Sequence, residues 1–314
     1  MTQTGPADPA RAIPGTGPAL LQRIAGAPIS WGVCEVPGWG WQPGPEQVLA
    51  EMRDVGLTAT EFGPEGFLPA DPADCARVLA RHELRAVGGF VPVLLHDQTH
   101  DPAPALDGTL DAFVAAGAGT VVLAAATGRE GYDDRPVLDE AGWATLLRNL
   151  DRLGAVALAR GIVPTLHPHV GTMIESAAEV QRVIADSGIG ICLDTGHLLI
   201  GGSDPVQLAA RHTDRIRHVH LKDVDAAWAA RVRTGAAGYT DAVRGGMYRP
   251  LGQGDVDIAA IVTSLQGAGY AGWYVLEQDS ILTGPADTVG ALADVRASVE
   301  HIRAVAERIE AGTG

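Results

Sequence analysis

Short apolar runs alternate with segments of helical periodicity along the chain, and this alternation limits the folds that the chain can adopt. The apolar runs, which predict strands, are Ile29–Cys34, Ala59–Gly63, Arg85–Val91, Thr120–Ala125, Ile162–His167, Gly190–Asp194, Ile216–Lys222 and Trp273–Glu277. The helical segments are Pro45–Val55, Pro72–His82, Gly108–Ala116, Asp139–Arg160, Ser176–Asp186, Asp204–His212, Ile258–Ala268 and Thr288–Ile309. A strand that is regularly followed by a helix is typical of parallel sheets, and this repetition predicts an α/β fold, a single (β/α)8 TIM barrel.

The rival fold is an open, doubly wound sheet. A glycine-rich phosphate-binding turn after the first strand would favour it, and the sequence has no GxGxxG motif there and no Walker motif. We expect the barrel to span residues 26–314 and to follow a flexible tail, residues 1–25, whose first part is rich in Pro, Gly and Thr. Two long segments, Val36–Gly44 and Val224–Gly254, follow predicted strands and should lie on the catalytic face of the barrel.

Charge and composition exclude several classes of partner. A formal charge of −15 disfavours nucleic acids and anionic membrane surfaces. The three cysteines lie far apart, so a disulfide framework or a structural zinc site is not expected. No apolar run approaches the length of a membrane span, and the first residues do not resemble a signal peptide. We expect a cytoplasmic protein that acts on a small molecule; self-association as a homo-oligomer stays open.

Polar residues concentrate where the predicted strands end. Asp194, His220, Lys222 and Glu277 lie at the carboxyl ends of three strands, where barrel enzymes build their sites. Period-two alternation points all four toward the barrel interior. Lys222 is also the only lysine among the 23 lysines and arginines, which suggests a role that a guanidinium cannot fill. Beside a cation, its pKa should be lowered toward neutrality.

Carboxylates that converge in a barrel mouth repel one another unless a cation compensates them. Asp194, His220 and Glu277 offer two oxygens and one nitrogen, a set that suits a divalent transition metal better than Ca²⁺. We expect Mn²⁺ or Co²⁺, with Zn²⁺, Fe²⁺ or Mg²⁺ as alternatives. The fourth ligand is either His167, at the end of a strand, or Glu175, where the next helix begins.

Several motifs together resemble a known family. They are Ile29–Glu35, Glu61–Gly66, His167–Thr172, Leu193–His197, His218–Asp223 and Pro250–Asp255. The chain resembles the xylose-isomerase-like sugar isomerase/epimerase superfamily and, within it, the inosose dehydratases. This resemblance implies a barrel in which a Glu, an Asp, a His and a Glu on successive strands bind metal. The last three positions match Asp194, His220 and Glu277, whereas His167 stands where the first Glu is expected.

The resemblance implies a metal-dependent lyase that removes water from a cyclic polyol ketone, 2-keto-myo-inositol. A base removes the α-proton, the metal stabilises the enediolate, and the β-hydroxyl leaves. We expect Glu277 or else His169 as the base, and His197 or Lys222 as the acid. The side chains expected to contact the ring hydroxyls or the ring face are Trp31, Glu35, Glu61 and Arg249.

Two alternatives stay open. The first is a sugar or sugar-phosphate isomerase/epimerase that uses the same metal site; the missing carboxylate at His167 counts against it, because epimerases use a pair of carboxylates for proton transfer on two faces. The second is a non-catalytic polyol-binding barrel.

Overall fold

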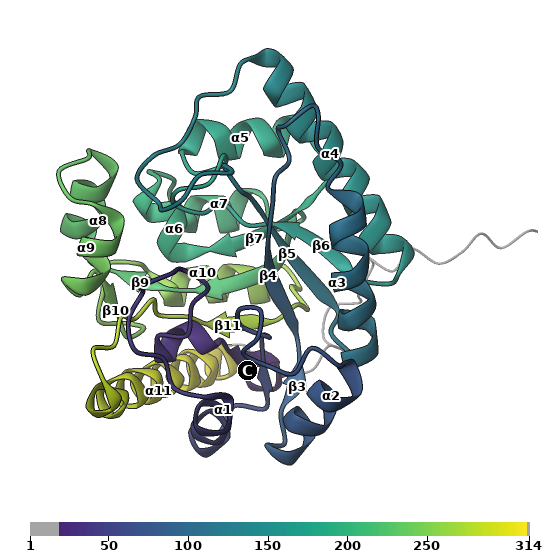
Figure 1. The fold of residues 1–314 in the computed structure, drawn as a ribbon. Helices are drawn as coiled ribbons and strands as arrows, with labels where there is room; N and C mark the ends of the chain where they lie inside the picture. Colours follow the sequence, from purple (N-terminus) through teal and green to yellow (C-terminus); the bar gives the residue numbers. More distant parts are fainter. Residues whose placement is uncertain (1–18, 313–314) are drawn as a thin grey trace, which may run out of the picture.

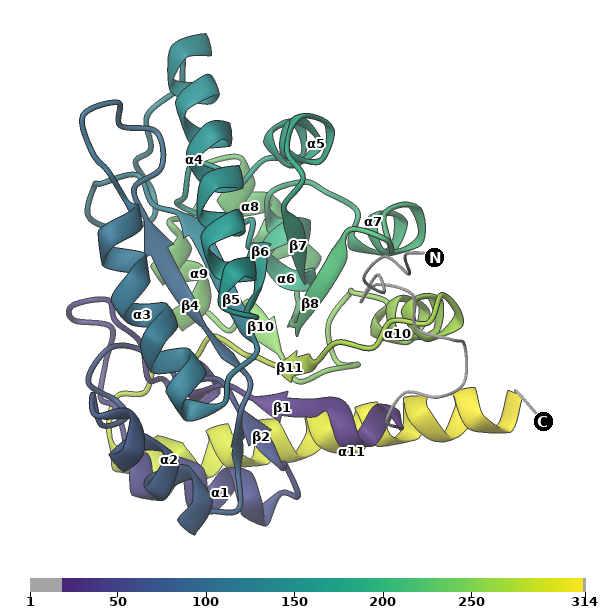
Figure 2. The same cartoon turned by 90° about the vertical axis from the view of Figure 1, so that its right-hand side faces the viewer.

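A ring of parallel strands surrounded by helices forms the molecule (Figures 1 and 2), and the computed structural model describes residues 19–312. The strands of the ring are β1 (Ile24–Gly26), β2 (Ala59–Thr60), β3 (Arg85–Ala86), β4 (Gly88–Val93), β5 (Thr120–Ala125), β6 (Val163–Leu166), β7 (Gly190–Asp194), β8 (Ile216–Leu221) and β11 (Tyr274–Leu276). Their order is β3-β2-β1-β11-β8-β7-β6-β5-β4, and every neighbouring pair is parallel.

The ring closes because β3 and β4 are two parts of one strand, separated only by Val87. The backbone N–H of Val87 donates to Thr60 O at 3.0 Å on the β2 side, and its carbonyl accepts from Gly119 N at 3.0 Å on the β5 side. One strand therefore joins both ends of the sheet, and the predicted parallel barrel is confirmed.

Helices cover the outside of the barrel. They are α1 (Pro45–Asp54), α2 (Pro72–Arg81), α3 (Ala103–Ala116), α4 (Glu140–Ala159), α5 (Ala177–Asp186), α6 (Thr195–Ile200), α7 (Pro205–Arg211), α10 (Ile258–Gly267) and α11 (Thr288–Gly312). Several of these helices begin at a capping residue. Asp71 and Asp204 are each followed by a proline, and each carboxylate accepts hydrogen bonds from backbone N–H groups of the first turn. Ser176 forms a capping box with Glu179. None of the helices within residues 19–312 is long and apolar enough to cross a membrane.

The first strand lies earlier than the sequence predicted. Ile29–Cys34 is not a strand: Pro28–Trp31 forms a 3-10 helix, which ends at Gly32 in the left-handed region with φ 75°. A proline in the first turn and a left-handed glycine favour a short helical turn over an extended strand. The first strand is Ile24–Gly26 instead, preceded by a 3-10 helix, Leu20–Arg23. Residues 20–25, predicted as part of the tail, thus belong to the barrel; residues 1–18 lie outside the described residues.

The long segment after β8 folds into a small lobe beside the barrel mouth, at the left of Figure 1. It contains β9 (Asp223–Val224), α8 (Ala226–Arg233), α9 (Tyr239–Arg244) and β10 (Tyr248–Arg249), and β9 pairs with β10 in antiparallel fashion. The buried Asp223 carboxylate accepts four backbone N–H bonds, from Val224, Gly252, Gly254 and Val256, at 2.8–3.0 Å. One side chain thereby fixes both ends of the lobe.

Candidate active site

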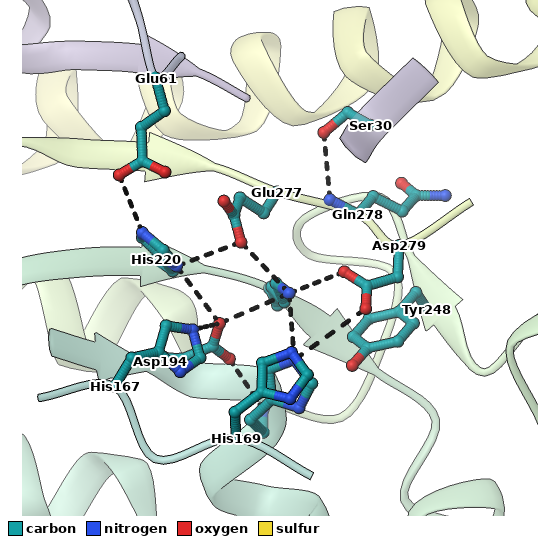
Figure 3. A network of polar contacts seen from close by, with 12 residues as sticks. Ser30, Glu61, His167, His169, Asp194, His220, Tyr248, Glu277, Gln278 and Asp279 are labelled. Carbon is teal, nitrogen blue, oxygen red and sulfur yellow. Dashed lines mark hydrogen bonds and ion pairs between the residues drawn. The ribbon is translucent and has the colours of Figure 1, made fainter. Parts of the chain in front are cut away.

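Three ligand-type side chains meet at the carboxyl ends of the last strands (Figure 3). Asp194 is the last residue of β7, His220 lies near the end of β8, and Glu277 follows β11. Nδ1 of His220 lies 3.6 Å from Asp194 Oδ2 and 3.1 Å from Glu277 Oε2. All three residues are buried. The sequence prediction that these strand ends converge is correct.

The His220 ring is oriented by a carboxylate from the opposite side of the barrel. Its Nε2 lies 3.1 Å from Glu61 Oε1, which also lies 2.8 Å from His218 Nε2. Because Glu61 is surrounded by these two imidazoles, its pKa is lowered despite burial, which by itself would raise it. An ionised Glu61 accepts the proton on His220 Nε2, and Nδ1 has no hydrogen-bond partner. Burial alone would lower the pKa of His220, but electrostatic interactions with Cys192, Glu277 and Glu61 outweigh burial and raise this pKa well above its usual value, so the ring also carries a proton on Nδ1 that a cation would displace. A buried imidazole nitrogen between two carboxylates fits a divalent cation.

Lys222 lies at the centre of the carboxylates. Its Nζ is 2.7 Å from Asp279 Oδ1, 3.2 Å from Glu277 Oε2 and 3.5 Å from Asp194 Oδ2. Burial alone would lower its pKa, but the three negative charges outweigh burial and raise this pKa well above its usual value. These carboxylates make Lys222 a cation, and the lowered pKa that we expect for it beside a bound metal ion stays a prediction.

Three histidines border this cluster. His167 Nδ1 donates to Pro168 O at 2.9 Å, and its Nε2 lies 3.1 Å from Asp194 Oδ2. His169 Nδ1 donates to Val170 O at 2.7 Å, which leaves its Nε2 unprotonated in the neutral ring. The ring of His197 lies 3.7 Å from that of His169, centroid to centroid. Burial and the neighbouring positive groups lower the pKa of His169 to about 3 and that of His197 well below its usual value, so both rings are neutral.

A cavity of about 720 Å³ opens onto the cluster. Of the residues that the sequence singled out, His167, His169, His220, Lys222, Glu277, Glu35 and Glu61 line it. Asp194 and His197 lie behind this lining, in contact with it through Lys222. The volume lies in the range of small-molecule sites in proteins.

Three predicted site residues lie elsewhere. Trp31 is fully buried, and its indole N–H donates to Glu51 at 2.6 Å. Glu175 accepts from Gly171 N at 2.7 Å and lies outside the ligand cluster. Arg249 projects from β10, half exposed, 3.5 Å from Asp225. The structure does not place these three residues at the cavity lining.

Sequence reasoning missed Asp279 and the tyrosines that hold it. Its Oδ2 accepts from Tyr239 Oη at 2.5 Å, and Tyr239 contacts Tyr248 Oη at 2.9 Å. Both tyrosines come from the lobe after β8. A signal for Asp279 existed, since it lies two residues after Glu277 and shares its face of an extended chain; no local pattern indicated the tyrosines.

A closed parallel barrel with ionisable side chains gathered at the carboxyl ends of its strands has the architecture of the TIM-barrel enzymes. The chain belongs to the family described as Xylose isomerase-like TIM barrel, whose pattern matches residues 38–305. Together with the relatives below, this membership identifies the chain as an enzyme.

Curated relatives cover most of the chain. An inosose dehydratase of Geobacillus thermodenitrificans is 30% identical over 82% of this chain and 91% of its own length. The rhizopine catabolism protein MocC of Rhizobium meliloti is 34% identical over 82% of this chain and 81% of its own length. A crystal structure of the IOLI protein with a bound zinc atom shares the fold, with a TM-score of 0.66 and 13% identity, over 91% of this chain and 99% of the other.

Proposed function

We propose that this enzyme is a metal-dependent hydro-lyase that removes water from a cyclic polyol ketone, with 2-keto-myo-inositol as the substrate. The observation that carries the proposal is the unpartnered Nδ1 of His220, which faces the carboxylates of Asp194 and Glu277. The inosose dehydratases among the relatives support the substrate class.

The residues that would hold the ion are Asp194, His220 and Glu277, with His167 as the fourth ligand. Nε2 of His167 faces Asp194, whereas Glu175 is already engaged by Gly171 N. Mn²⁺ or Co²⁺ suits this mixture of oxygen and nitrogen donors. When bound, such an ion supplies Lewis-acid stabilisation for negative charge on the substrate's carbonyl oxygen.

His169 is the base that we propose, in preference to Glu277. Oε2 of Glu277 lies within 3.2 Å of both His220 Nδ1 and Lys222 Nζ, so this oxygen is engaged. His169 lines the cavity as a neutral ring whose Nε2 carries a lone pair, because Nδ1–H is held by Val170 O. The α-proton would pass to this nitrogen.

Lys222 is the acid in this scheme. It is the cation that reaches the cavity lining, while His197 is neutral and lies behind it. A proton from Nζ would join the leaving β-hydroxyl and release it as water, which leaves a conjugated ketone. His197 and Asp279 lie within 3.2 Å of Nζ and position it.

The test is to incubate the Mn²⁺-loaded enzyme with 2-keto-myo-inositol and to follow the ultraviolet absorbance of the conjugated product. We expect H169Q to lose dehydration but keep Mn²⁺ binding, and D194N to lose both. An isomerase or epimerase on the same site would change the substrate's NMR spectrum without a gain in absorbance. Dehydration that survives complete removal of metal would refute the proposal.

A further inference from the structure

The cavity extends well beyond the polar cluster. Its inner end carries the histidines, carboxylates and Lys222 described above, and its other end is lined mostly by apolar side chains, together with Glu65, His100 and Thr109. We call this other end the apolar arm; it is lined by Phe62, Leu68, Cys75, Val91, Leu106 and Phe113. These residues come from the segment after β2, from α2, from β4 and from α3, and α2 and α3 lie side by side in both views (Figures 1 and 2).

Helix α3 keeps the arm open because it presents small side chains to it. Ala105, Gly108, Ala112 and Ala116 all line the cavity, and their spacing of three or four residues places them on one face of the helix. A Cβ atom added at Gly108 would meet nothing within 4 Å. Ala105 and Gly108 are exposed, so this part of α3 forms the open rim of the arm, and a larger group has room there.

The arm begins next to the reacting groups. Phe90 lines the cavity, and its ring centroid lies 5.8 Å from that of His167 and 5.5 Å from that of His169. Phe90 thus lies against the two histidines of the polar end. A substituent on a ring bound at the metal cluster would enter the arm directly past this phenyl ring.

A bare polyol ring would leave the arm unused. A cavity of about 720 Å³ is of the size that encloses a drug-sized ligand, much larger than one six-membered ring. Hydroxyl groups gain nothing among aliphatic side chains, and water is held poorly where polar partners are few. The unpartnered His220 Nδ1 at the inner end shows where the polar part of a ligand belongs.

We propose that the site also takes ring polyol ketones that bear an apolar substituent, alkyl or aryl, and that this substituent occupies the apolar arm. This inference rests on the proposed function, and it extends the substrate class from 2-keto-myo-inositol to substituted rings of the same kind. The polyol ring would lie at Lys222 and the ligand cluster, and the substituent would lie between α2 and α3.

The test uses the full chain loaded with Mn²⁺ and two non-reacting probes, myo-inositol and a benzyl ether of myo-inositol, in calorimetric titrations. We expect the ether to bind at least tenfold more tightly, with a more negative heat-capacity change, because its phenyl ring is buried. G108L should abolish this gain by filling the arm, and A112F provides a second filling variant. A115L is the matched control, because Ala115 is exposed on the same helix and does not line the cavity.

Equal affinity of the two probes for the wild-type enzyme would overturn the inference. Equal affinity is also the result expected if a second subunit filled the arm. A gain that persists in well-folded G108L and A112F would also overturn it. The dehydration assay on 2-keto-myo-inositol, run in parallel, separates the two proposals. A lack of dehydration with the arm-dependent gain intact refutes only the lyase reaction.

Discussion

Glu61 should control metal affinity without contacting the metal. We expect E61Q to weaken Mn²⁺ binding, because the amide can replace only part of what the carboxylate does. The carboxylate accepts from His218 Nε2 at 2.8 Å and from His220 Nε2 at 3.1 Å through the same oxygen. The neutral amide holds the proton on His220 Nε2 less firmly, so Nδ1 is less strictly kept as the nitrogen that a cation would bind.

The size of the expected change in Mn²⁺ affinity follows from the hydrogen bond between Glu61 and His220. A hydrogen bond to a charged group contributes about 1.5–3 kcal/mol, and removal of a carboxylate behind a histidine ligand typically costs about 10–100-fold in metal affinity. We therefore expect the dissociation constant for Mn²⁺ to rise by about 10–100-fold. The assay is competition with a chromophoric chelator at fixed pH.

Glu65 offers a matched control. It follows in the same segment and lines the same cavity, but it is exposed, so E65Q should leave Mn²⁺ affinity unchanged. Circular dichroism establishes that both variants are folded. If E61Q binds Mn²⁺ within twofold of the wild type, Glu61 does not orient His220, and the argument from the unpartnered Nδ1 fails.

Three further predictions follow from other contacts. K222R should lower turnover by about 100-fold or more, because a flat guanidinium cannot take the place of Nζ among three carboxylates or give up a proton as readily; wild-type turnover would remove Lys222 from the chemistry. D223N should reduce the free energy of unfolding by about 2–6 kcal/mol in urea denaturation, since two of the four backbone N–H groups would face an amide NH₂; an unchanged midpoint would contradict this. The pKa of Glu179 is lowered because bonds to Arg135 and to the N–H groups of Glu175 and Ser176 outweigh burial, so its contribution to stability is present above about pH 4.5 and is lost as the pH falls below that value. The stability difference between E179Q and the wild type should accordingly shrink between pH 5 and pH 3, and a difference that grows on acidification would refute this assignment.

Strands were predictable where the local pattern was long enough. Thr120–Ala125 and Gly190–Asp194 have the predicted bounds because each is a continuous apolar run bordered by turn residues. The three residues of Ile24–Gly26 are too few to show a period, and their backbone is extended because the neighbouring strands pair with it. The neighbouring Ile29–Cys34 had the composition of a strand, but Pro28 and Gly32 favoured a turn.

The candidate site was predictable where it follows from the order of the strands. Asp194, His220 and Glu277 come together because parallel strands end on one face, so their positions follow from the topology. The position of Trp31 could not be predicted from residue type. An aromatic ring near a barrel mouth can line a pocket or pack in the core, and Trp31 packs in the core. Tyr239 lies in the lobe after β8, and only tertiary folding brings it to the barrel mouth.

The bond between Glu61 and His220 joins residues 159 positions apart, from the first strands and the last strands of the barrel. During refolding, the chain cannot complete the cation site that we propose until these distant segments have met. A fragment that lacks either segment would contain carboxylates and imidazoles but no oriented nitrogen. Ion uptake should therefore be a late event that reports barrel closure, and added metal would stabilise the closed ring without assisting the early steps of assembly.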